Sequence, residues 1–114
     1  MDEFQRRILE IFPNEISRII LYGSYAKDTA SPESDLDVLV CVRWSEAQQL
    51  WEHYWVHISD KRWQQIINSA IDSLQSGGPC ISPLVVGDSL WDKNIPIIEE
   101  AKREGIVLWQ NSPT

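Results

Sequence analysis

The sequence is short of positive charge. Its 114 residues include 10 Lys and Arg against 17 Asp and Glu, which gives a formal net charge of −7. A protein that binds nucleic acid over a broad surface needs clustered positive charge to meet the phosphates. The composition therefore argues against a direct nucleic-acid partner. It still allows a nucleotide held through a divalent metal ion, or a basic protein partner.

Long apolar runs and paired cysteines are also missing. No apolar run approaches the roughly 18 residues that a membrane span needs. The start of the sequence, residues 1–7, is acidic and then basic, unlike a signal peptide. Cys41 and Cys80 belong to no paired motif. We therefore expect no membrane association and two reduced, buried thiols in a cytoplasmic protein, with a disulfide as the alternative.

Apolar periodicity predicts a chain in which helices and strands alternate. Helices are expected over 2–12, over 45–74 with a break near 59–60, and over 89–104 with an interruption at 94–96; strands are expected over 17–22, 35–42, 80–86 and 106–109. Pro83 within the third strand favours an edge position or a bulge. This order predicts a single domain over 1–114 of the α/β or α+β class, with a small mixed sheet flanked by helices.

The strand over 35–42 carries two carboxylates at its start. Side chains alternate along a strand, so Asp35 and Asp37 lie on one face, with Cα atoms about 6.6 Å apart. The other face is uniformly apolar and is expected to be core; it consists of Leu36, Val38, Val40 and Val42. Two carboxylates at this spacing can hold the pair of Mg²⁺ ions, roughly 3.5–4 Å apart, that phosphoryl transfer uses.

A glycine and a serine precede this strand by ten residues. Gly23 allows the backbone to approach a phosphate without a Cβ in the way. Ser24 offers a hydroxyl and free backbone N–H groups to a triphosphate. Each part also has a purely structural interpretation, as a turn glycine and a solvated strand end. The combination of a buried strand, Gly-Ser, a polar loop and Asp-x-Asp favours nucleotidyl transfer.

The run Gly23-Ser24, ten residues, Asp35-Leu36-Asp37 resembles the signature of the minimal nucleotidyltransferases of the DNA polymerase beta-like superfamily. The segments 81–86 and 100–108 are also similar to the tail of small bacterial members. The resemblance implies a nucleotidyltransferase fold, ATP as substrate with Mg²⁺, and transfer of a nucleoside monophosphate to a hydroxyl. It further implies a HEPN-domain toxin as partner, with this chain as the antitoxin. Carried over by position, Gly23 and Ser24 would cradle the triphosphate, and Asp35 and Asp37 would bind the metal ions.

Two departures from the family pattern stand out. Lys27 occupies a position where members often have arginine, so it would meet a phosphate as a point charge without a bidentate fork. The third carboxylate that the superfamily commonly places on the next core strand is missing from 81–86. Asp88 lies just beyond that strand and is the nearest candidate, although capping of the following helix is the competing interpretation.

Other signals favour structural roles. His53 and His57 have a spacing that can ligate zinc, but no third ligand is evident. Six tryptophans are assigned to core packing, with a protein interface as the alternative for Trp51 and Trp55. The charged run over 99–104 is interpreted as a solvated helix face.

Two functions of different classes therefore remain. The first is a metal-dependent nucleotidyltransferase that adenylylates a protein hydroxyl. The second is a catalytically silent subunit that neutralises a basic partner by contact, which the missing third acid and the negative charge favour. The sequence leaves the acceptor, the preferred nucleotide and homo-oligomerisation open.

Overall fold

The structure is a computed structural model that describes residues 2–23, 36–43, 61–92 and 95–110. The predicted helix over 45–60 and both histidines lie outside the described residues, as do three of the tryptophans, Trp44, Trp51 and Trp55.

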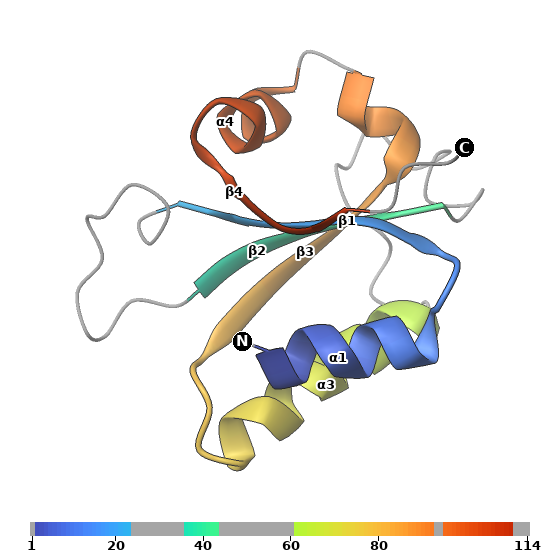
Figure 1. Ribbon diagram of the computed structural model, residues 1–114, viewed down its shortest axis with the longest axis vertical. Helices are drawn as coiled ribbons and strands as arrows, with labels where there is room; N and C mark the ends of the chain where they lie inside the picture. Colours follow the sequence, from blue (N-terminus) through green and yellow to red (C-terminus); the bar gives the residue numbers. More distant parts are fainter. Residues whose placement is uncertain (1, 24–35, 44–60, 93–94, 111–114) are drawn as a thin grey trace.

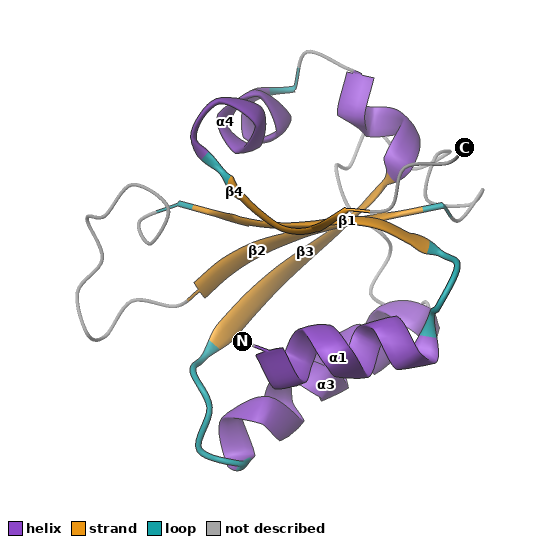
Figure 2. Ribbon diagram, viewed as in Figure 1, coloured by secondary structure: helices purple, strands orange, loops and turns teal. Residues whose placement is uncertain are grey.

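Four strands form one mixed sheet in the order β3-β2-β1-β4 (Figure 2). The strands are β1 (Ile16–Tyr22), β2 (Leu36–Val42), β3 (Ile81–Gly87) and β4 (Ile106–Gln110). β1 pairs antiparallel with both β2 and β4, whereas β2 and β3 are parallel. Because β3 is parallel to β2, the chain must cross back over the sheet between them, and α3 provides the described part of that crossover.

Helices cover both faces of this sheet (Figure 1). α1 (Asp2–Ile11) and α3 (Lys61–Gln75) lie side by side below it. The short 3-10 helix η2 (Asp88–Asp92) and α4 (Pro96–Glu104) lie above it. α4 covers the end of the sheet where β1 finishes and β2 begins, and η2 covers the other end.

The alternation of β2 divides the core into two layers. Leu36, Val38, Val40 and Val42 pack downward against α1 and α3, together with Phe4, Ile8 and Ile66. Leu39 and Cys41 point upward and pack with Ile20, Val86, Ile98 and Ala101. The apolar face predicted for this strand is therefore core, as expected. Asp37 belongs to the upper face, under α4.

Most of the predicted elements are confirmed, with shifts of one or two residues at their ends. β3 is an edge strand of the described sheet, in agreement with Pro83. The segment predicted as helix from residue 89 differs, because its first part is the 3-10 helix Asp88–Asp92 and the α-helix begins only at Pro96. Proline at the first turn lacks only an N–H that an α-helix leaves unpaired there, so it favours that start.

The cysteine prediction was half wrong. Both thiols are free, but only Cys41 is buried, whereas Cys80 is exposed just before β3. Burial raises the pKa of the Cys41 thiol to about 12, with smaller opposing contributions from Arg18, which lowers it, and Asp88, which raises it. Within the described residues, no helix has the length and apolar character that a bilayer crossing requires.

Candidate active site

Gly23 lies immediately after β1 and has a left-handed backbone, with φ of +75°. Only glycine adopts this conformation without strain. A Cβ at this position would also lie 2.5 Å from Oδ2 of Asp37. The glycine is thus required twice, once for the turn and once because the carboxylate of β2 occupies the space beside it.

Asp37 faces the upper side of the sheet near the start of β2. Its cross-strand partner on β1 is Tyr22, and its parallel partner on β3 is Ser82. The Asp37 residue is half-buried and Ser82 is exposed. In the sheet, Asp37 therefore stands between a tyrosine and a serine, near the start of β2.

Tyr22 is influenced by the charge of this carboxylate and by that of a second one on α4. Its ring packs against the upper core. Burial, and then the negative charges of Asp37 and Glu100, raise the pKa of the Tyr22 phenol to about 12. The shift extends to higher pH the range over which the phenol keeps its proton.

The structure brings together two of the predicted site residues, Gly23 and Asp37. The other three, Ser24, Lys27 and Asp35, lie outside the described residues, so their predicted roles stay predictions. Within the described part of the chain, no three His, Cys, Asp or Glu side chains gather closely enough to hold a metal ion. Asp37 does fit a hard cation, because it offers a half-buried carboxylate, and carboxylate oxygens are the ligands that such a cation takes.

Asp88 cannot serve as the third acid of this site. β3 runs parallel to β2, with Ser82 beside Asp37 and Gly87 beside Val42. Asp88 follows Gly87, six residues beyond Ser82, and so lies about 20 Å from the Asp37 end of the sheet at the usual rise of a strand.

The contacts of Asp88 are structural. Its carboxylate accepts hydrogen bonds from Ser17 Oγ at 2.5 Å and from Arg18 Nη1 at 2.7 Å. The Arg18 guanidinium also lies 4.5 Å from the ring centroid of Trp91. The described hydrogen-bond partners of Asp88 therefore belong to β1, and the predicted helix-capping role stays a prediction.

Two residues near the site were missed by sequence reasoning. Tyr22 was treated only as part of a buried strand, although its position directly before Gly23 and two residues after Ile20 places it on the upper face. Glu100 was assigned to a solvated helix face, yet it is half-buried and its charge reaches Tyr22. The spacing of three from Ile97, which packs on the upper core, could have indicated this orientation.

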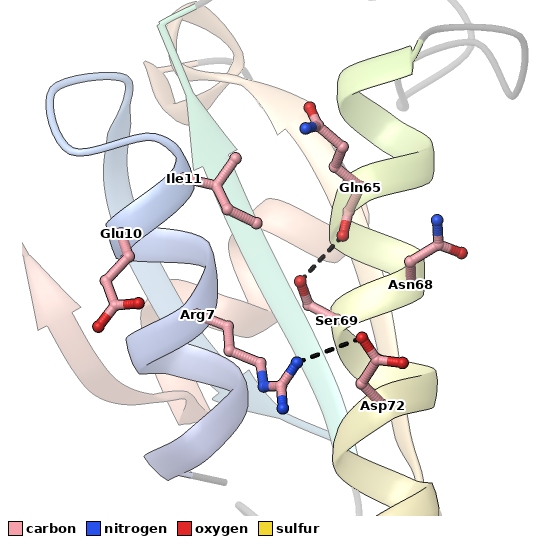
Figure 3. A pocket seen from close by; sticks show the side chains of 7 residues that line it. All are labelled: Arg7, Glu10, Ile11, Gln65, Asn68, Ser69 and Asp72. Carbon is pink, nitrogen blue, oxygen red and sulfur yellow. Dashed lines mark hydrogen bonds and ion pairs between the residues drawn. The ribbon is translucent and has the colours of Figure 1, made fainter.

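The described residues also form a polar groove elsewhere, between α1 and α3 (Figure 3). It has a volume of about 340 Å³. Arg7 Nη1 bridges it to Asp72 Oδ2 at 3.2 Å, and Ser69 Oγ donates to the Gln65 carbonyl at 2.9 Å. The groove lies below the sheet, whereas Asp37 and α4 lie above it, so it is separate from the candidate site.

The left-handed Gly23 after β1 and the acid near the start of β2 agree with the motif found in the sequence. Comparison with known proteins agrees. The chain matches the family described as nucleotidyltransferase domain over residues 1–103, and it therefore belongs to that family. The family match confirms the nucleotidyltransferase that the motif predicted.

The curated relatives match over shorter segments. One protein of Methanocaldococcus jannaschii, named "putative protein adenylyltransferase", is 44% identical over 41 residues, which is 36% of this chain and 41% of that protein. A second protein of the same organism and the same description is 42% identical over 43 residues, or 38% of this chain and 29% of that protein. The matched segments thus span less than half of either relative.

Two solved structures share the fold across nearly the whole chain. A toxin–antitoxin structure with AMP-PNP superimposes with a TM-score of 0.61 at 17% identity, covering 97% of this chain and 75% of that one. A mutant of the toxin–antitoxin MntA-HpeT superimposes with a TM-score of 0.54 at 18% identity, covering 97% and 73%. At these identities the likeness establishes the nucleotidyltransferase fold.

Proposed function

We propose that this chain transfers AMP from ATP to a hydroxyl of a protein partner. The observation that carries the proposal is the close approach of the left-handed Gly23 to the Asp37 carboxylate, because it puts a backbone turn without a side chain directly beside an acid near the start of β2. The names of the two archaeal relatives support a protein acceptor. The AMP-PNP in the first structural neighbour supports ATP as the nucleotide.

Each residue has a defined task in this proposal. Gly23 and Ser24 approach the triphosphate, and Lys27 contributes a positive charge to it. Asp37, together with Asp35, holds Mg²⁺ through carboxylate oxygens. Bound Mg²⁺ supplies neutralisation of the charge that builds on the phosphates during transfer. The protein residues then need only orient the nucleotide, since phosphoryl transfer depends mainly on positioning and electrostatics.

The proposed biological setting is the antitoxin half of a toxin–antitoxin pair, with a HEPN-domain toxin as the acceptor. The two structural neighbours, which are described as toxin–antitoxin structures, support this setting. A cytoplasmic location is part of the same proposal.

The test is the mass of the partner. The chain is produced together with its co-purifying protein and treated with ATP and Mg²⁺, and the intact mass of each protein is measured. We expect the partner to gain one AMP with the wild-type chain and none with an Asp35→Asn, Asp37→Asn double variant. Asp92→Asn is the control, because Asp92 is an exposed acid on η2 at the other end of the sheet. Equal labelling by the wild type and the double variant would show that the site is not catalytic.

A silent binding subunit is the second candidate. Ser82 favours it, since a hydroxyl stands on β3 beside Asp37 where the family commonly has an acid. In that case the double variant would neutralise the partner as well as the wild type does. Loss of neutralisation by a correctly folded double variant would favour the enzyme.

A further inference from the structure

A second groove lies between α3 and β3, at one edge of the described sheet. It has a volume of about 260 Å³. The α3 side of its lining is wholly apolar, and none of the described residues that line it is charged. A chain with a formal net charge of −7 thus has an uncharged hollow at this edge.

Apolar side chains in this groove are open to solvent. Ile71 and Leu74 of α3 are 45% and 48% exposed, whereas Ala70 and Ile81 belong to the lower core. Exposed apolar side chains that gather beside a hollow are typical of an interaction site. Because an apolar cavity of roughly 150 Å³ holds benzene, this groove has room for an aromatic or branched side chain of another molecule.

The groove reaches the candidate active site at Ser82. This serine lines the groove, and it is the parallel partner of Asp37. Neighbouring strands lie about 4.8 Å apart, so one wall of the groove comes within a single strand spacing of the proposed metal ligand. A molecule in the groove would therefore sit at the edge of the sheet and leave the upper face, which Asp37 faces, to the nucleotide.

The edge of β3 disfavours an added strand as the occupant. The Cys80 carbonyl accepts a hydrogen bond from the Leu36 N–H at 2.9 Å, so the backbone of Cys80 faces β2. Backbone groups alternate in direction along a strand, which turns Pro83 toward the open edge. Proline has no N–H to donate there. The groove therefore fits a side chain better than it fits a strand.

We propose that this groove docks the protein that receives AMP, through an apolar side chain close to the acceptor hydroxyl. This assignment rests on the proposed function. An apolar anchor beside Ser82 would fix the position of the hydroxyl relative to Asp37, and phosphoryl transfer depends mainly on such positioning. The acidic chain attracts a basic partner, whose apolar side chain enters the one uncharged surface next to the site.

Cys80 is a natural reporter of docking, because its thiol is exposed and it lines the groove. Cys41 is buried, and burial raises the pKa of its thiol to about 12, so it should not react. The first experiment follows alkylation of wild-type Cys80 by N-ethylmaleimide through the intact mass. The chain is treated alone, with α,β-methylene-ATP and Mg²⁺, and with the partner identified by its gain of AMP.

We expect the partner to protect Cys80. At a partner concentration of about ten times Kd, roughly one chain in eleven is unoccupied, so alkylation should slow by about 10-fold. The nucleotide analogue cannot be cleaved between its α- and β-phosphates and occupies the site without transfer. It should leave the alkylation rate unchanged, because the nucleotide is placed on the upper face.

The second experiment uses an Ile71→Gln, Leu74→Gln double variant. Its Kd for the partner should rise by about 10-fold or more, as when anchor residues of an interface are lost. Its affinity for the analogue and its transfer rate at saturating partner should stay within about twofold of wild type. Ile11→Gln is the control, because Ile11 is 41% exposed on α1 and lies outside this groove. It should change none of the three quantities by more than about twofold.

Several results would overturn the assignment. Unchanged partner affinity in the double variant, or no protection of Cys80 by bound partner, would reject the groove, while transfer by the wild type would keep the proposed function. Protection by the analogue alone would assign the groove to the nucleotide. Slower alkylation as the concentration of the chain alone rises would assign it to a second copy. Absence of transfer by the wild type, with Cys80 protected by the co-purifying protein, would reject the proposed function and keep the groove as the contact surface of a silent subunit.

Discussion

The two ends of the upper sheet face use their carboxylates in opposite ways. At one end Asp88 meets a guanidinium and a buried hydroxyl, from Arg18 and Ser17. At the other end Asp37 has a phenol, a serine and a glycine as its neighbours in the sheet, and a second acid, Glu100, acts on the same phenol. An acid paired with a base indicates a role in stability. At this second end both acids act on a phenol and raise its pKa, whereas at the first end the acid is paired with a cation.

Two cations also contact an aromatic ring at the Asp88 end of the sheet, which supports a role in stability for this end. Arg18 lies over one ring, that of Trp91, and Lys102 Nζ lies 5.2 Å from the same ring centroid. These contacts tie η2 and α4 to β1. They hold these two helices against the upper face of the sheet.

The largest effect is expected from Gly23→Ala at the acidic end. Alanine would need a left-handed backbone and its Cβ would press on the Asp37 carboxylate. We expect a loss of stability of about 1–3 kcal/mol from the backbone, and a fall in AMP transfer of roughly 100-fold from the displaced carboxylate. Stability is measured by urea unfolding, and transfer by the mass gain of the partner.

Gly77→Ala is the matched control for this change. Gly77 also has a left-handed backbone, with φ of +90°, but a Cβ added there would meet no other atom within 4 Å. The variant should lose stability by about 1–2 kcal/mol and keep its transfer rate per folded molecule. If both variants lost transfer equally, the contact with Asp37 would not be what makes Gly23 necessary.

A smaller effect on stability, and none on transfer per folded molecule, is expected from Asp88→Ala. The change leaves the Arg18 charge unpaired and removes one hydrogen-bond partner of Ser17, which is 2% exposed. Ser17 Oγ keeps its bond to the Cys41 carbonyl, and the Arg18 and Asp88 side chains are 22% and 34% exposed, so the cost should be about 1–2 kcal/mol.

Asp92→Ala serves as the comparison, because this acid is exposed on the same 3-10 helix. It should unfold at the same urea concentration as the wild type. A loss of transfer in Asp88→Ala at unchanged stability would contradict the division of the sheet into a structural end and a functional end.

The smallest effect is confined to high pH and concerns Tyr22. The pKa of its phenol is raised from 10.0 to about 12, mainly by burial, so the folded chain holds this proton more tightly than the unfolded chain does. The resulting stabilisation is fully present below pH 10 and is lost as the pH rises from about 10 to about 12.

Urea unfolding at pH 9 and pH 11 measures this loss. The wild type should lose more stability between the two pH values than Tyr22→Phe, which has no phenol to titrate. Glu100→Gln should fall between them, because it removes one of the charges that raise the pKa of Tyr22. Identical losses in all three proteins would mean that burial and the two carboxylates do not raise the pKa of Tyr22.

Sequence reasoning succeeded where the signal was local. The apolar alternation of Leu36, Val38 and Val40 predicted one buried face of β2, and Gly23 before a polar loop predicted a tight turn near the acids. It could not settle the positions of Asp88 and Glu100. Closeness in sequence to β3 made Asp88 the nearest candidate for a third acid, and the charged run over 99–104 gave no sign that Glu100 is half-buried while Glu99 is exposed.

The sequence by itself determined the elements of this protein and the family to which it belongs. Side-chain alternation, glycine conformation and the spacing of Gly-Ser and Asp-x-Asp all act within a few residues of chain. Only the tertiary structure decided where the acids lie. The parallel pairing of β3 with β2 carries Asp88 to the far end of the sheet, and the packing of α4 on the upper core puts this helix over the end where β1 finishes and β2 begins. These placements depend on contacts between distant segments, which no local pattern encodes.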